Sequence, residues 1–260
     1  RNQKHLGKID REHLPRARAQ RLEHSNGFAA AIQKCLHRIG NSDATRDEGR
    51  EPGQRFIAPR SLAEFAQWRA ALPEARILAG ATDIGLWVNK QFRTLGDILY
   101  VGQVPELQAI TPWANGKGLS IGAAASLEAA WGALAERLPE LKELWLRFAS
   151  PPVRRAGTLG GNVANGSPIG DAPPVLLALG AELVLRRGEH TRRVPLHGFY
   201  LDYMKNDLQP GEFLQDVRVP LPRPSQRLRA YKLSKRYDCD ISALCAGLSV
   251  DVEAIEFVDL

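Results

Sequence analysis

Two short stretches of glycine and other small residues most constrain the fold of this chain. The first is Ile77–Gly85 (ILAGATDIG), in which an apolar, strand-like segment ends at Gly80. The second is Arg154–Asn162 (RRAGTLGGN), which continues through further small residues to Asp171. Small residues let a ligand approach the main chain, and successive N–H groups in such turns form anion-binding nests. Because neither stretch has the spacing G-x-G-x-x-G, we exclude the Rossmann arrangement and predict two separate anion-binding loops.

Polar side chains near these stretches suit a nucleotide with a diphosphate group. Thr82 offers a hydroxyl donor, Asn162 a short amide, and Asp171 a carboxylate for ribose hydroxyls. We expect Gly160 and Gly161 to adopt backbone angles that other residues avoid. Two alternatives stay open: the first stretch also fits a plain strand-to-helix turn, and Asp171 also fits a helix cap before two prolines.

The remaining pattern predicts alternating helices and strands. Ser61-Leu-Ala-Glu64 is typical of a capping box, with Ser61 as the N-cap of a helix through about residue 72. Further helices are expected at 127–138, 140–148 and 175–179, a loop over 157–171, and strands at 76–79, 97–101, 119–123, 181–186, 192–196, 213–219, 228–234 and 243–252. This order predicts an α+β or mixed α/β class.

The positive charge of the chain is concentrated at its start. The net charge is +6, but residues 1–55 alone hold 12 Lys or Arg against 7 Asp or Glu. These residues are mostly polar and end in a linker-like run, so we interpret 1–55 as a basic leader and linker. A basic leader can also attract nucleic acid, but it lacks interleaved aromatic residues for base stacking, so we favour no nucleic-acid partner.

Several classes of site are absent from the sequence. The three cysteines, Cys35, Cys239 and Cys245, form no C-x-x-C pair, which argues against zinc and iron–sulfur sites and against a disulfide framework. We therefore expect a cytoplasmic protein and no metal site in this chain. No apolar run is long enough for a membrane span, no signal peptide follows Arg1, and no P-loop or G-x-S-x-G motif is present.

Three segments resemble the FAD domain of the molybdenum hydroxylase family. They are Ile77–Lys90 (ILAGATDIGLWVNK), Val153–Asp171 (VRRAGTLGGNVANGSPIGD) and Ala230–Ile241 (AYKLSKRYDCDI). The resemblance covers about residues 56–260 and looks closest to the small iron–sulfur/FAD subunit of bacterial xanthine dehydrogenases. It implies an α+β, two-subdomain, non-Rossmann fold of the PCMH/vanillyl-alcohol oxidase type. It places the FAD-binding domain at 56–225 and the start of a truncated C-terminal flavoprotein domain at 226–260.

The resemblance also implies roles for individual residues. All are cofactor-binding, and none is catalytic or a metal ligand. The first loop, Ile77, Leu78, Ala79, Gly80, Ala81, Thr82, Asp83 and Ile84, would wrap the diphosphate of FAD, and Thr158, Leu159, Gly160, Gly161 and Asn162 would hold it from the other side. Phe148 and Leu208 would lie near the flavin, with Asp171 and Lys232 as acidic and basic contacts. Without the resemblance, helix packing would explain Phe148 equally well, and a core or surface position would be the better explanation for Leu208 and Lys232. No histidine or cysteine lies in either glycine loop, which predicts noncovalent FAD.

The resemblance implies an electron-transfer role rather than chemistry on a substrate. Electrons would pass from iron–sulfur clusters through FAD to NAD, as in a xanthine dehydrogenase of purine catabolism. The 2Fe-2S clusters and molybdopterin would belong to a partner iron–sulfur domain or subunit and a molybdopterin-binding large subunit, giving a hetero-oligomer. Ala81 and Arg155 depart from the usual glycine and asparagine, and the chain resembles a fragment or a differently split subunit. The alternatives are the medium FAD subunit of a carbon monoxide dehydrogenase or aldehyde oxidoreductase and, from another class, a nucleic-acid-binding module.

Overall fold

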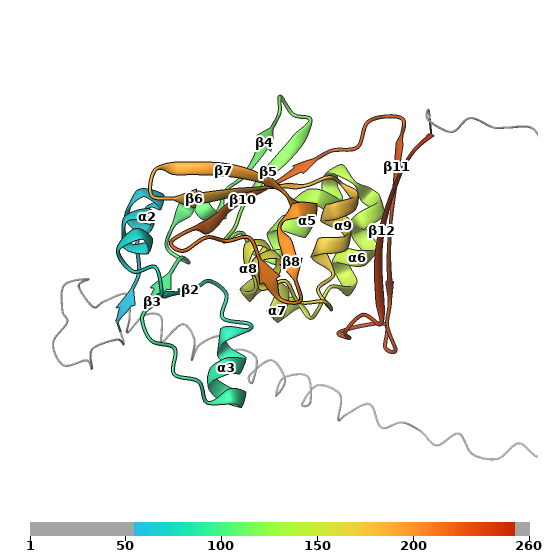
Figure 1. Cartoon of the computed structure of the whole chain (residues 1–260). Coiled ribbons are helices and arrows are strands. Elements are labelled where there is room, and N and C mark those ends of the chain that lie inside the picture. Colours follow the sequence, from blue (N-terminus) through green and yellow to red (C-terminus); the bar gives the residue numbers. More distant parts are fainter. Residues whose placement is uncertain (1–54, 253–260) are drawn as a thin grey trace, which may run out of the picture. The chain divides into compact units, whose positions relative to one another are not determined.

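The computed structural model describes residues 55–252 (Figure 1). Residue contacts divide the chain between Gly49 and Arg50, so the described residues all belong to the second unit. The leader expected at 1–55 lies outside the described residues except for Arg55, as does the end of the segment expected at 226–260.

A small parallel sheet forms the first subdomain. Its order is β1 (Phe56–Ile57), β3 (Ile98–Tyr100) and β2 (Arg76–Leu78), and it is joined by helices α2 (Leu62–Ala71), α3 (Ile84–Gln91) and α4 (Pro105–Gln108). Buried Phe65 of α2 packs against Phe213, with ring centres 4.5 Å apart. Phe213 belongs to the second sheet, so the two subdomains share this aromatic contact.

The start of α2 confirms the predicted N-cap but not the complete capping box. Ser61 Oγ accepts a hydrogen bond from the Glu64 main-chain N–H at 3.2 Å. The Glu64 carboxylate accepts from the N–H of Arg60 at 2.7 Å rather than from that of Ser61. The prediction that Glu64 closes back on the N-cap residue itself is therefore wrong by one residue.

A five-stranded antiparallel sheet forms the second subdomain. Its order is β4 (Ile110–Trp113), β5 (Gly118–Gly122), β10 (Phe213–Pro220), β6 (Glu182–Arg187) and β7 (His190–Pro195). Its helices are α5 (Leu127–Arg137), η1 (Pro139–Leu141), α6 (Lys142–Arg147), α7 (Pro151–Ala156), α8 (Leu159–Asn165) and α9 (Ala172–Ala178). Fully buried Trp131 of α5 joins Ile121 of β5 and Val217 of β10 in one core, which holds the helical layer against the sheet.

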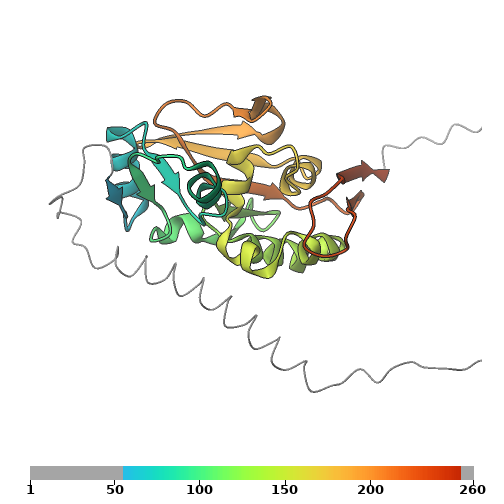
Figure 2. The same ribbon diagram turned by 90° about the horizontal axis from the view of Figure 1, so that it is seen from below.

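Two hairpins complete the described chain. After η2 (Leu196–Gly198), strands β8 (Tyr200–Asp202) and β9 (Lys205–Asn206) form a very short one. Strands β11 (Gln226–Leu233) and β12 (Leu244–Asp251) form a long one, which stands beside the helices on the side away from the first subdomain (Figures 1 and 2). Gly247 lets β12 approach α9 closely, because a Cβ there would lie 2.4 Å from the carbonyl oxygen of Pro174.

The glycine-rich segment 157–171 differs most from expectation. We predicted a loop, but residues 159–165 form α8, and α9 begins at Ala172 rather than at Val175. Thr158 caps α8, and Leu159 and Val163 are fully buried on its inner face. Capping and burial together outweigh the low helix propensity of two adjacent glycines.

Candidate functional site

A cavity of about 330 Å³ lies where the first glycine loop meets α8. Residues of both subdomains line it, from β2 and α3 on one side to α8, β10 and the segment that follows β5 on the other. Of the predicted site residues, those that line the cavity are Ile77, Ala79, Gly80, Ala81, Thr82, Asp83, Ile84, Thr158, Gly160, Gly161, Asn162 and Leu208. The structure thus brings both predicted loops to one site, and the role of each residue in binding stays a prediction.

The first loop offers free main-chain donors. Within the part of the chain that the structure describes, the N–H groups of Gly80, Ala81, Thr82 and Asp83 donate no hydrogen bond. Ala81 has a φ of 60°, in the left-handed region that favours glycine. This turn can therefore direct several N–H groups at an anion in the cavity.

Gly80 itself is required by packing inside the protein. A Cβ at this position would lie 1.7 Å from the carbonyl oxygen of Ala156, at the end of α7. The φ of Gly80 is not positive, so its importance is not conformational freedom. The close approach of the loop to α7 fixes one wall of the cavity.

The main chain of the second loop is already occupied. The N–H of Leu159 donates to Ala125 O at 3.0 Å, that of Gly160 to Ala123 O at 2.9 Å, and that of Gly161 to the Thr158 hydroxyl at 3.1 Å. The expected anion nest of N–H groups at 158–162 is therefore wrong. The expectation of unusual angles at Gly160 and Gly161 is also wrong, because both residues are helical and neither has a positive φ.

The side-chain surface of α8 nevertheless faces the cavity. Gly160 is packed against Ala123, whose Cβ would lie 2.4 Å from an added Cβ, whereas a Cβ on exposed Gly161 would meet only the Thr158 hydroxyl. Asn162 lines the cavity, and its buried Oδ1 has no hydrogen-bond partner among residues 55–252. A buried acceptor of this kind costs free energy unless a ligand or water donates to it. The exposed face of Gly161, where an added Cβ would lie 2.9 Å from the Thr158 hydroxyl, and an unsatisfied oxygen at Asn162 both fit a bound polar ligand.

Sequence reasoning missed much of the cavity lining. The residues not predicted are Phe65, Trp87, Val101, Leu107, Ala123, Ala124, Leu127, Gly157, Ala164, Asn165, Phe213 and Leu214. Trp87 lies between two cations, with the guanidinium carbons of Arg76 and Arg93 each 5.4 Å from its ring centre. The run of small residues at 123–125, directly after a strand, was a usable signal. The apolar residues carried none, because core and cavity positions look alike in sequence.

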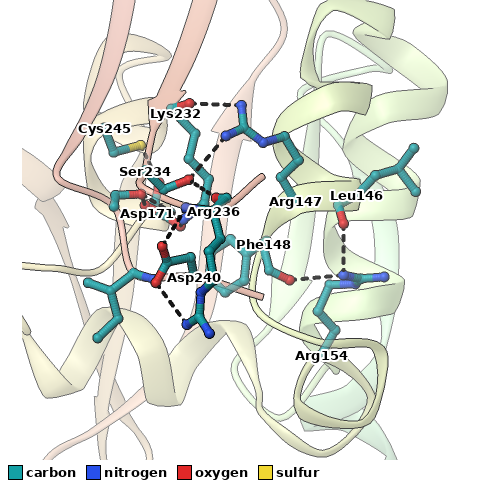
Figure 3. A network of polar contacts seen from close by, with 12 residues as sticks. Leu146, Arg147, Phe148, Arg154, Asp171, Lys232, Ser234, Arg236, Asp240 and Cys245 are labelled. Atoms are coloured by element: carbon teal, nitrogen blue, oxygen red, sulfur yellow. Dashed lines mark hydrogen bonds and ion pairs between the residues drawn. The ribbon is translucent and has the colours of Figure 1, made fainter. Parts of the chain in front are cut away.

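Asp171 and Lys232 contact each other instead of lining the cavity (Figure 3). Lys232 Nζ lies 2.6 Å from Asp171 Oδ2 and also 2.6 Å from the hydroxyl of Ser242, and both charged side chains are buried. Asp171 is the N-cap residue of α9, as the alternative predicted, but its side chain makes no cap hydrogen bond. That both residues contact FAD stays a prediction.

Three other predicted residues do not line the cavity, and two of them, Phe148 and Leu159, belong to the protein core. Leu78 lies in β2 opposite Tyr100, and Leu159 is fully buried on α8. Phe148 is 5% exposed, and its ring centre lies 5.8 Å from that of Trp131. Core packing therefore accounts for the apolar side chains of Phe148 and Leu159 without contact to a ligand.

Buried arginines hold the segments around this core (Figure 3). Arg154 Nη1 donates to Phe148 O at 2.9 Å, and its Nε pairs with Glu128, which lowers the pKa of that carboxyl. Arg147 donates to Lys232 O at 2.8 Å and to Tyr237 O at 3.2 Å. Arg147 thereby holds the segment that contains Asp238, Cys239 and Asp240 against α6. These three residues do not line the cavity, and no pattern in the sequence pointed to Arg147.

Two further features bear on the class of protein. Within residues 55–252, no group of three or more histidine, cysteine or acidic side chains is placed to hold a metal ion. No helix in the same range is long and apolar enough to cross a membrane.

Known proteins with similar sequences agree with a ligand-binding cavity between the two loops. The sequence profile of the family described as "FAD binding domain in molybdopterin dehydrogenase" matches residues 51–222. The chain is 31% identical over 214 residues to a xanthine dehydrogenase of Drosophila pseudoobscura pseudoobscura, covering 76% of this chain and 16% of that protein. Nicotinate hydroxylase hnxS of Emericella nidulans is also 31% identical, over 216 residues and with the same coverage. The chain thus spans about one sixth of the length of these curated relatives.

Solved structures show the same fold. Reconstituted CO dehydrogenase from Oligotropha carboxidovorans superposes with a TM-score of 0.69 and 29% identity, over 77% of this chain and 70% of that chain. Quinoline 2-oxidoreductase from Pseudomonas putida 86 gives a TM-score of 0.64 and 27% identity, over 74% and 67%. These matches confirm the predicted two-subdomain, non-Rossmann FAD-binding fold of the PCMH type. The chain therefore belongs to the family of FAD-binding domains of molybdopterin dehydrogenases.

Proposed function

We propose that this chain binds FAD noncovalently in the cavity between the two subdomains and passes electrons through it. The observation that carries the proposal is the meeting of the two loops at one cavity. One loop has unused main-chain donors at Gly80–Asp83, and the other presents Gly161 and the unsatisfied Oδ1 of Asn162. Separate donors and acceptors on opposite walls suit a ligand with both a diphosphate and hydroxyl or amine groups.

The residues of the two walls would have different tasks. The N–H groups of Gly80–Asp83 would bind the anionic diphosphate, and Asn162 would orient a donor group of the ligand. Leu208 would contribute apolar surface, while a cavity of about 330 Å³ is at the low end for ligand sites, so part of a dinucleotide would extend beyond it. Bound FAD supplies the redox chemistry, and the protein supplies placement and exclusion of solvent.

We further propose that the electron donors lie in other domains or chains and that NAD is the acceptor, as in a cytoplasmic xanthine dehydrogenase. The match to xanthine dehydrogenases over 76% of this chain supports this assignment, as does the segment Gly85–Lys90. On this proposal the 2Fe-2S clusters and molybdopterin belong to an iron–sulfur domain and a molybdopterin-binding large subunit of a hetero-oligomer. Residues 226–260 would begin a second flavoprotein domain.

A second assignment has a specific observation in its favour. The chain aligns with 70% of a chain of CO dehydrogenase, compared with one sixth of the curated xanthine dehydrogenases. This coverage supports a separate FAD subunit of the carbon monoxide dehydrogenase or aldehyde oxidoreductase type. We propose NAD as the acceptor only for the first assignment, so reduction by NADH separates the two.

Anaerobic titration of the full 260-residue chain tests both the binding of FAD and the choice between the two assignments. We expect FAD to bind with quenching or shift of its fluorescence, and acid precipitation to release all of it to the supernatant. NADH should then bleach the flavin, whereas xanthine alone should not. Absence of FAD binding contradicts the function, bleaching by xanthine alone contradicts the electron-transfer role, and failure of NADH favours the CO dehydrogenase type.

A further inference from the structure

The side chain of Asn206 joins two parts of the cavity wall that are far apart in sequence. Its Nδ2 donates to the carbonyl oxygen of Ala164 at 2.8 Å. Its Oδ1 accepts from the main-chain N–H of Leu208 at 3.2 Å. Ala164 and Leu208 both line the cavity, but Asn206 does not. One amide therefore sets the separation of two lining segments without itself facing a ligand.

A second side chain of the same short hairpin holds the same helix. The hydroxyl of Tyr200 donates to the carbonyl oxygen of Val163 at 2.9 Å. Tyr200 and Asn206 are directly paired in the β8–β9 hairpin. Carbonyl groups in the last turn of a helix lack the usual partner four residues on. The carbonyl of Val163 also accepts from the N–H of Gly166 at 3.2 Å, whereas that of Ala164 accepts from the amide of Asn206. The hairpin thus holds the C-terminal turn of α8.

The other end of α8 carries the residues that face the proposed ligand. The helix has only seven residues, and Gly161 and Asn162 lie within its first turn. A displacement of its last turn would therefore shift Asn162 as well. Buried Leu159 and Val163 and the main-chain hydrogen bonds of Leu159 and Gly160 hold the first turn of the helix, so Asn206 and Tyr200 add the restraint at its last turn.

We infer that Asn206 and Tyr200 are positioning residues for the proposed FAD site, which lock α8 and Leu208 into one wall. The inference rests on the proposed function for its ligand, and on the hydrogen bonds above for its geometry. It assigns a task to a hairpin that the glycine motifs do not include.

The test compares variants that differ by a single group. Asn206→Asp keeps the acceptor for Leu208 but replaces the donor to Ala164 with a repelling oxygen, and Asn115→Asp makes the same change in the exposed β4–β5 turn. Tyr200→Phe removes one hydroxyl, and Tyr203→Phe is its control, because Tyr203 is 74% exposed. We would measure the FAD dissociation constant, the flavin absorption spectrum at saturation, and the urea midpoint of the apoprotein.

We expect the dissociation constant to rise about tenfold in Asn206→Asp, where a repelling oxygen is added, and severalfold in Tyr200→Phe, as for one lost part-buried hydrogen bond. The flavin spectrum should shift in Asn206→Asp, and both control variants should match the wild type. Unchanged affinity in Asn206→Asp would overturn the inference, and so would a loss of affinity that only follows a lowered urea midpoint. Hydrogen exchange of the apoprotein adds a readout without FAD, with faster exchange expected at Val163–Asn165 and Leu208 but not in β10. If the wild type fails to bind FAD, the proposed function falls and this inference with it.

Discussion

Lys232 Nζ lies 2.6 Å from Asp171 Oδ2, and the two side chains are only 2% and 7% exposed. The pair joins β11 to the start of α9, and so connects the long hairpin to the helical layer. A buried ion pair of this kind is weak evidence for net stability, but loss of one partner leaves an uncompensated charge. The contact therefore gives a sharp test of what these two residues do.

Lys232→Met should destabilise the protein by about 3–5 kcal/mol, because the Asp171 carboxylate would stay buried without its cation. The double variant Lys232→Met, Asp171→Leu should recover most of that loss, and urea denaturation measures both. FAD titration of the recovered double variant then tests the predicted contacts with the cofactor. If the single variant loses less than about 1 kcal/mol, the pair is not buried as described.

Gly161→Val should lower FAD affinity at least tenfold while the fold is retained, because the branched side chain would fill the cavity where Gly161 now leaves room. Gly198→Val controls for the added side chain alone, since nothing lies within 4 Å of a Cβ there, whereas a Cβ at Gly161 would lie 2.9 Å from the Thr158 hydroxyl that caps α8. The flavin content of both purified variants and their circular dichroism spectra give the comparison. Equal flavin content would show that α8 does not face the cofactor.

Ala81→Gly should stabilise the apoprotein by about 0.5 kcal/mol, because relief of the left-handed strain exceeds the added chain entropy of glycine. Ala79→Gly has no positive φ to relieve, so we expect it to destabilise by about 0.5–1 kcal/mol. Thermal or urea unfolding of the two variants shows whether each substitution raises or lowers the free energy of unfolding. A destabilising Ala81→Gly would mean that the turn carries no strain at Ala81.

The two described cysteines should differ strongly in reactivity. Burial, together with the neighbouring Asp171 carboxylate, raises the pKa of the Cys245 thiol to about 12. At pH 8 only about one part in ten thousand would be thiolate, the form that alkylating agents attack. Cys239 is exposed. Iodoacetamide followed by peptide mass spectrometry should modify Cys239 in the native protein and Cys245 only after unfolding, so equal labelling in the native state would contradict the burial of Cys245.

Local signals in the sequence predicted much of the fold. Asn115-Gly116 correctly indicated a turn into the strand found at Gly118–Gly122. The partner strand β4 was missed because Pro112 is disfavoured in strands, and it is tolerated here because β4 is an edge of the sheet. Long-range contacts had no signal: nothing in the spacing of Asp171 and Lys232 shows that they pair.

The candidate site was predictable in outline but not in its division of tasks. Glycine content correctly located both loops beside one cavity. It could not show that Gly80 and Gly160 are required by contact with Ala156 and Ala123 rather than by a ligand. That distinction depends on which segments pack together in three dimensions.

The hydrogen-bonded start of α8 has a consequence for the entropy of binding. Because its N–H groups already have protein acceptors, this wall is ordered before a cofactor arrives and loses little conformational freedom on binding. Most of the conformational freedom lost on binding is therefore lost by the turn at Gly80–Asp83, whose N–H donors are unused. Differences in affinity between related proteins should therefore follow the stiffness of the first loop, and substitutions that rigidify this turn should slow dissociation more than they change the encounter rate.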